Sequence, residues 1–173
     1  MLADPPCSDP MKNFDIVRFR PDSGLISRLG YGKVYCAGTD VDIRSRITPS
    51  RLPLIIESGD PGVLITALRD NEVAGIIFEG NNPIRRVVEK ASELRKTVFI
   101  PIKVLINSEP QERGKVLGNL RKTAYACTKL GTLSSIISLA ESKEQMLSSA
   151  QILGVAELII GSGRGPRILR SSM

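Results

Sequence analysis

Short aliphatic runs alternate with segments of helical period along most of the chain. Runs rich in Val and Ile predict buried strands, and apolar positions three or four residues apart predict helices. The predicted strands are 14–19, 33–36, 54–57, 75–79, 98–105, 133–138 and 156–160. The predicted helices are 22–29, 61–71, 83–96, 109–130 and 142–153, and the stretch 39–51, which has no clear period, is expected to be a loop.

Strict alternation of strands with helices predicts a parallel sheet with right-handed crossovers. No GxGxxG follows the first strand, so a barrel is favoured over a dinucleotide-binding sheet. The 173 residues fall below the roughly 200 of the smallest (β/α) barrels. We therefore predict a small or incomplete (β/α) TIM-like barrel of about seven parallel strands. It would occupy 14–160 as one domain, after an irregular lead-in (1–13) and before a basic tail (161–173).

Composition places the chain among globular proteins, with 42% hydrophobic and 24% charged residues. Its three cysteines are far apart and form no CxxC, which favours free thiols in a reducing compartment. No apolar run approaches the ~18 residues of a membrane span. The first residues contain no apolar stretch of the kind found in a secretory signal. A cytoplasmic location without membrane partners is expected.

The net charge of +6 is unevenly distributed. Residues 1–60 contain eight basic and eight acidic side chains, whereas residues 101–173 contain ten and five. Such a basic C-terminal third indicates either contact with a polyanion or a solvated surface kept for solubility. Charge alone does not separate these two interpretations.

The absence of histidine excludes several chemistries. Ser-His and Cys-His nucleophile pairs and imidazole metal sites are impossible. The enzyme hypothesis that remains uses side chains expected at the strand ends, which would bind a divalent metal or act as acid and base. The alternative is that they only form salt bridges there. These residues are Glu57, Glu79, Lys103 and Glu141.

The predicted helix 109–130 separates an apolar face from a basic one. Val116, Leu117, Leu120, Ala124, Cys127 and Leu130 share one side at 100° per residue, and Lys115, Lys122 and Lys129 share the other, flanked by Arg121. A lysine stripe is either solvated surface or a phosphate-binding surface. Arg113 is expected to face the core at the first turn and Lys103 to lie inside a strand, where a buried cation needs an anion. Ser108 to Gln111 fits a capping box.

After the last predicted strand comes a glycine-rich segment, 161–165. It is either a flexible tail or a weak phosphate-binding loop. Arg164, Arg167 and Arg170 follow three residues apart, a spacing that suits phosphate contacts formed on binding.

The segment from Thr97 contains an aliphatic run with an internal lysine, IPIKVLI, and then the junction SEPQER. With Leu117, Lys122, Ala124 and the later ISLAESK, it resembles the archaeal ribonuclease P protein component 3 family, counterpart of the human thirty-kilodalton subunit. The resemblance implies a barrel similar to the polymerase-and-histidinol-phosphatase enzymes but without their metal site. It also implies a subunit that acts with protein component 2 on the catalytic domain of the ribonuclease P RNA, which removes 5′ leaders from precursor tRNA.

On this resemblance the chain is expected to be a non-catalytic subunit of an endonuclease. The implied partners are ribonuclease P RNA, protein component 2, other protein subunits and, indirectly, precursor tRNA. No cofactor is expected on the chain, and Mg²⁺ would act through the RNA. Few aromatics are present for stacking, so shape and backbone are expected to dominate recognition. The predicted RNA-binding residues are Lys103, Arg113, Arg121, Lys122, Lys143, Arg164 and Arg167.

Two other functions remain open. One is a small barrel enzyme that acts on a phosphorylated substrate through the strand-end carboxylates. The other is a general RNA-binding module unrelated to tRNA processing.

Overall fold

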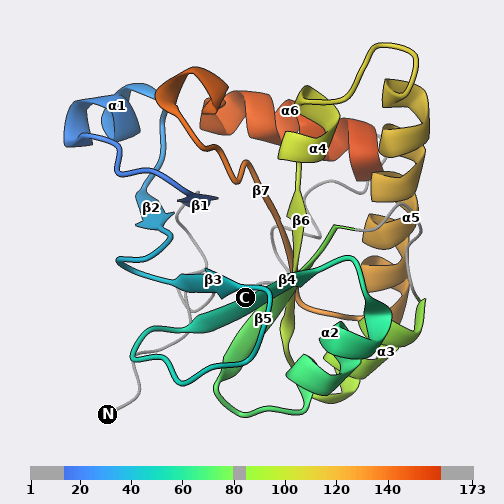
Figure 1. Ribbon diagram of the computed structural model, residues 1–173. Coiled ribbons are helices and arrows are strands. Elements are labelled where there is room, and N and C mark those ends of the chain that lie inside the picture. Colours follow the sequence, from blue (N-terminus) through green and yellow to red (C-terminus); the bar gives the residue numbers. More distant parts are fainter. Residues whose placement is uncertain (1–13, 80–84, 161–173) are drawn as a thin grey trace.

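The computed structural model describes residues 14–79 and 85–160, which form an α/β fold around parallel strands (Figure 1). A five-stranded sheet has the order β3-β4-β5-β6-β7, and a two-stranded sheet pairs β1 with β2. All these pairings are parallel, as predicted. The strands are β1 (Phe14–Val17), β2 (Lys33–Cys36), β3 (Asp42–Arg44), β4 (Leu54–Ser58), β5 (Val73–Phe78), β6 (Thr97–Pro101) and β7 (Ser134–Ile137).

Backbone contacts join the two sheets at both of their ends. An isolated parallel bridge between Ala37 and Val41 links the end of β2 to the start of β3. Beyond β7, the Leu139 N–H donates to the Ile16 carbonyl of β1 at 3.0 Å. The fold is therefore consistent with a partial α/β barrel.

Apolar side chains from the strands of both sheets meet in one buried cluster. Aliphatic side chains dominate it, as expected for parallel strands that are buried on both faces. Phe99 is the large exception, and Gly75 makes room for it, since a Cβ at Gly75 would lie 2.7 Å from the Phe99 ring. The buried members are Ile16, Val41, Ile55, Ile77, Phe99, Ile137 and Leu139.

Helices α2, α3, α5 and α6 pack against the outside of the strands (Figure 1). Asp22 and Asp60 cap the first two helices, because each carboxylate accepts a backbone N–H at 2.7 Å, from Leu25 and Gly62. No helix among the described residues is long and apolar enough to cross a membrane. The helices are α1 (Ser23–Arg28), α2 (Pro61–Leu68), α3 (Arg85–Glu93), α4 (Lys103–Ile106), α5 (Arg113–Leu130), the 3₁₀ turn η1 (Lys143–Gln145) and α6 (Ser149–Ile160).

The predicted strand 98–105 is wrong in its second half. β6 ends at Pro101, and a single helical turn, α4, begins at Lys103. The Ile102 N–H still donates to the Ile137 carbonyl, and the Leu105 N–H then turns back to the Ile102 carbonyl. An aliphatic run such as KVLI has no periodicity that distinguishes a strand from a short buried helix.

Two further predictions are wrong. The stretch 156–160 is the end of helix α6, where Ile152, Ala156 and Ile159 are buried at helical spacing. The stretch 39–51, expected to be a loop, contains the short strand β3, so the seven strands of residues 14–79 and 85–160 are a different set from the predicted one. The first residues of the predicted helix 83–96, which corresponds to α3, lie outside the described residues.

Candidate nucleic-acid interface

Five charged side chains gather where the strands end, and we call them the strand-end cluster: Arg18, Glu57, Glu79, Lys103 and Glu141. The Glu57 carboxylate pairs with the Arg18 guanidinium and lies 3.5 Å from the Lys103 ammonium. A Glu141 oxygen lies 3.8 Å from the same ammonium. The sequence placed four of these residues at one edge of the strands. Arg18 was missed because it fell inside the predicted first strand.

The cluster neutralises most of its own charge. Burial first, and then repulsion from Glu57, raise the pKa of Glu79, while Lys103 and Arg18 oppose that rise. Among residues 14–79 and 85–160, no three Asp, Glu or Cys side chains are placed to share a metal ion. Glu57 and Glu141 form salt bridges, as the salt-bridge interpretation of the strand-end carboxylates expects.

A second polar feature is the buried Asp15 of β1, which bonds to Ser138 directly after β7. One Asp15 oxygen accepts the N–H groups of Ile16 at 2.8 Å and Ser138 at 2.7 Å, and the other lies 2.5 Å from the Ser138 hydroxyl. Leu139 follows with φ at 52°, a left-handed conformation that costs a leucine about 1 kcal/mol or more. This strained turn lets the segment after β7 bond to both Asp15 and the β1 backbone.

Burial raises the pKa of Asp15 to about 6, although the bonds from Ser138 and Ile16 favour its charged form. Tyr31 also favours the charged form of this carboxyl, and its hydroxyl donates to the Leu147 carbonyl at 2.7 Å. Burial and the negative charge of Asp15 raise the pKa of Tyr31 as well. No sequence signal singles out Asp15, because an acid in an aliphatic strand has no partner that spacing reveals.

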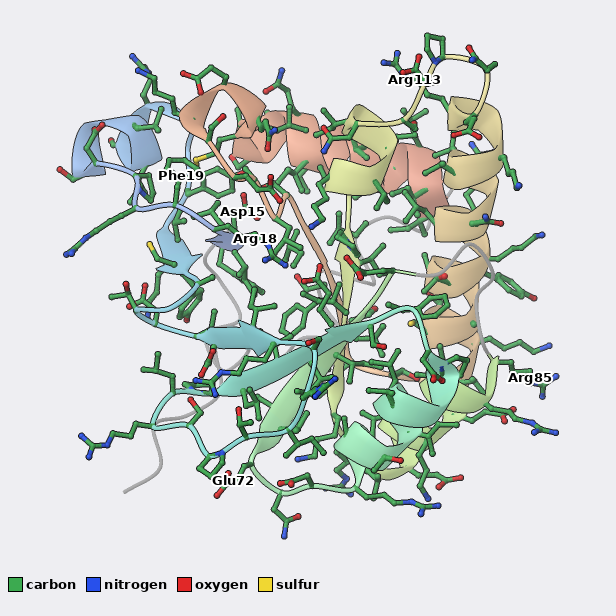
Figure 2. All side chains as sticks on the ribbon, viewed as in Figure 1. Asp15, Arg18, Phe19, Glu72, Arg85 and Arg113 are labelled. Atoms are coloured by element: carbon green, nitrogen blue, oxygen red, sulfur yellow. The ribbon has the colours of Figure 1, made fainter. Side chains whose placement is uncertain are left out.

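Lys103 and Arg113 do not lie where the sequence placed them. Lys103 is the first residue of α4, and its side chain is 17% exposed and held by two carboxylates. Arg113 is exposed, and its Nε donates to the Ser108 carbonyl at 3.2 Å. Figure 2 shows Arg113 at a corner of the molecule far from Asp15 and Arg18, so it does not face the strand-end cluster.

The expected capping box at Ser108 is also absent. Helix α5 begins at Arg113 and has no side-chain cap, and the Ser108 hydroxyl instead donates to the Leu105 carbonyl at 2.9 Å. Pro110 lies in the turn before the helix and not in its first turn. The SEPQER junction therefore bonds to the last turn of α4 and provides no side-chain cap for the start of α5.

The two faces predicted for α5 are confirmed. Leu120, Ala124 and Cys127 are buried, and Val116, Leu117 and Leu130 are half-buried. The helix contains five basic residues and no acidic one. Arg113 stands apart at the first turn, and we call the other exposed basic side chains of the helix the α5 cationic face: Lys115, Arg121, Lys122 and Lys129.

Among the residues that the structure describes, no carboxylate pairs with Lys115, Lys122 or Lys129. Arg121 is used structurally, because its Nε donates to the Leu158 carbonyl at 2.8 Å, in the last turn of α6. A cation at a helix C-terminus also interacts favourably with the helix dipole. Three lysines on the outer flank of α5 are therefore left for an external anion.

The remaining predicted RNA contacts are placed elsewhere. Lys143 is exposed in η1, where its ammonium lies 3.9 Å from the Glu144 carboxylate. Arg164, Arg167 and the glycine-rich segment 161–165 lie outside the described residues. The predicted set is therefore not one patch, and only Arg121 and Lys122 share the α5 cationic face.

Sequence reasoning missed one residue of this face. Tyr125 is 57% exposed on the outer side of α5, close to Arg121 and Lys122 at helical spacing. The same helical projection that revealed the lysine stripe places Tyr125 beside it. The scarcity of aromatics in the whole chain pointed away from stacking and so hid the position of this one ring.

Comparison with solved structures finds a chain from a cryo-EM structure of archaeal ribonuclease P with mature tRNA. The two chains share a TM-score of 0.74 at 15% sequence identity, over 92% of this chain and 88% of that chain. At such low identity the match shows a shared fold. It agrees, at the level of the fold, with the resemblance from Thr97 onward. No family model and no curated protein matches the sequence.

Proposed function

We propose that this chain is a protein subunit of ribonuclease P and that it binds RNA through the α5 cationic face. The observation that carries the proposal is an 18-residue helix with five basic residues, no acidic residue, and lysines on its outer side. The fold shared with a chain of an archaeal ribonuclease P structure supports the choice of this particular assembly.

The physical role of such a face is to neutralise phosphates. Each lysine that contacts a phosphate releases a condensed counterion, so binding weakens as salt rises. The subunit would stabilise the catalytic domain of the RNA and the Mg²⁺ sites within it. Protein component 2 and the other protein subunits are the proposed protein partners, and precursor tRNA is reached through the RNA. The chain itself supplies no chemistry in this proposal.

The first test measures the salt dependence of RNA binding. The double variant Lys122→Ala/Lys129→Ala is expected to lower the slope of log K against log salt by about 0.7–0.9 for each phosphate that is no longer neutralised. Fluorescence anisotropy of labelled ribonuclease P RNA over a salt series gives this slope.

Arg28→Ala is the matched control. It removes one exposed positive charge, where the double variant removes two, and it does so from α1, at the opposite side of the molecule from α5 (Figure 1). We expect its slope to equal that of the wild type. Equal slopes for the control and the double variant would remove the α5 cationic face from the RNA interface.

The second test asks whether the assembly is the right one. Precursor-tRNA cleavage is reconstituted from the cognate RNA and component 2, with and without this chain, at limiting magnesium. We expect the chain to restore cleavage at a magnesium concentration that is otherwise too low. An RNA-binding protein without such rescue would be a general RNA-binding module.

A further inference from the structure

The outer side of α5 carries a combination that charge neutralisation alone does not require. The chain has three tyrosines, of which Tyr31 is buried and Tyr35 is half-buried in edge contact with Phe14, beneath Lys33. Tyr125 alone among them is mostly exposed. A single exposed aromatic is ordinary on a protein surface. Tyr125 differs from such isolated aromatics in the residues that lie next to it on α5.

Basic side chains surround Tyr125. At about 100° per residue, Arg121 lies one turn before it on one side, and Lys122 and Lys129 lie on the other. An exposed aromatic ring next to cations, on a helix with no acidic residue, is an arrangement that proteins use to hold single-stranded nucleic acid. The ring stacks on a base while the cations contact the flanking phosphates.

Two glycines extend the same side of the helix. Gly114 and Gly118 precede Tyr125 by eleven and seven residues, which places both within about 20° of it around the axis. Glycine is unfavourable inside a helix. A Cβ at either position would meet nothing within 4 Å, so packing within the described chain does not require a glycine there. Both glycines leave the helix backbone open to a close external contact.

We infer that Tyr125 is a stacking platform for an unpaired RNA base, with the RNA backbone crossing α5 over Gly118 and Gly114. This inference rests on the proposed function and refines it, because it specifies an unpaired stretch of RNA as the ligand of the α5 cationic face. The scarcity of aromatics in the chain does not contradict it, since one ring suffices for one base.

The direct test uses the lack of tryptophan in the chain. Tyr125→Trp introduces a single tryptophan at the platform, whose emission can be excited selectively over that of the remaining tyrosines. We expect its emission to be quenched, with saturation, by an oligouridine of about twelve nucleotides and far less by an RNA duplex of equal phosphate concentration. Unchanged emission at oligouridine concentrations that saturate binding would overturn the inference.

Affinity measurements separate stacking from charge. Tyr125→Ala is expected to weaken oligouridine binding by about 5- to 100-fold without changing the salt slope, while Tyr125→Phe stays within about twofold of wild type. Lys122→Ala is expected to do the reverse and change the slope. Gly118→Ala is expected to raise Tm by about 2 °C and yet weaken binding. Unweakened binding in that variant would overturn the passage of the backbone over the glycines.

The outcomes also distinguish this inference from the proposed function. Full affinity in Tyr125→Ala, with a slope that still depends on Lys122, would overturn the platform and leave the proposed function standing. Absence of RNA binding by the wild type would overturn both. Loss of assembly with the other protein subunits in Tyr125→Ala, at unchanged RNA affinity, would make this ring a protein contact and overturn the platform.

Discussion

The strand-end cluster and the α5 cationic face carry similar side chains in opposite situations. In the cluster, Arg18 and Lys103 are held by carboxylates, and Lys103 is largely covered. On α5, Lys122 and Lys129 extend from a helix that has no acidic residue. A cation paired inside its own fold contributes to stability, whereas an unpaired cation at the surface is available to a ligand.

The same distinction corrects the charge count along the sequence. Residues 1–60 have no net charge, yet their acids act within the fold. Asp15 is buried, Asp22 and Asp60 cap helices, and Asp42 pairs with Arg44. The placement of each charge, and not its sign alone, therefore decides what it can bind.

The largest expected effect concerns pH and Asp15. Its pKa is raised in the folded state from 3.8 to about 6, so the folded protein binds the proton more tightly than the unfolded chain. The resulting stabilisation is complete below pH ~4 and is lost as pH rises through 6. The loss amounts to about 3 kcal/mol of the free energy of unfolding.

Asp15→Asn isolates this contribution, because its carbonyl oxygen can accept the N–H groups of Ile16 and Ser138 and its amide can donate to the Ser138 hydroxyl. Urea denaturation of both proteins from pH 4.5 to 8 is the measurement. The wild type is expected to lose stability relative to the variant as pH rises. Parallel curves would mean that Asp15 titrates near its ordinary pKa.

Glu57→Ala is expected to have the next largest effect on stability. It leaves Arg18 and Lys103 without their shared partner, with side chains 31% and 17% exposed. We expect the free energy of unfolding to fall by about 2 kcal/mol, less than for a fully buried pair because water reaches both cations. Glu141→Ala is the control within the cluster. Its side chain is 56% exposed, so a change below about 0.5 kcal/mol is expected. Equal losses would mean that burial does not set the strength of these pairs.

Much of this comparison was accessible from sequence, and the failures have two origins. Periodicity predicted the two faces of α5, and the order of elements predicted that Glu57, Glu79 and Glu141 would meet at one edge. Short aliphatic runs were assigned wrongly to strands, because KVLI and AELII fit a strand and a buried helix equally well. The partners of Asp15 depend on contacts between residues 123 positions apart, which no local pattern contains.

Glu79→Gln is expected to have a smaller effect of opposite sign. Burial and repulsion from Glu57 raise the pKa of Glu79, so its charge disfavours folding above that pKa. Because Glu79 is exposed, we expect the glutamine variant to gain only about 0.5 kcal/mol at pH 7.5. The gain should vanish near pH 4, where the carboxyl is protonated in the folded protein. Urea denaturation at the two pH values tests this, and a loss of stability at pH 7.5 would show that the charged form is favoured.

The smallest expected effect on stability completes the comparison. Lys122→Ala/Lys129→Ala removes two exposed cations that no described carboxylate pairs with, so the free energy of unfolding should stay within about 0.5 kcal/mol of wild type. The same variant should show a reduced slope of log K against log salt for RNA binding, because these lysines contact the ligand and do not stabilise the fold. Urea denaturation and RNA titration on one preparation give both values. A clear loss of stability would place the two lysines with the strand-end cluster, as parts of the structure and not of its interface.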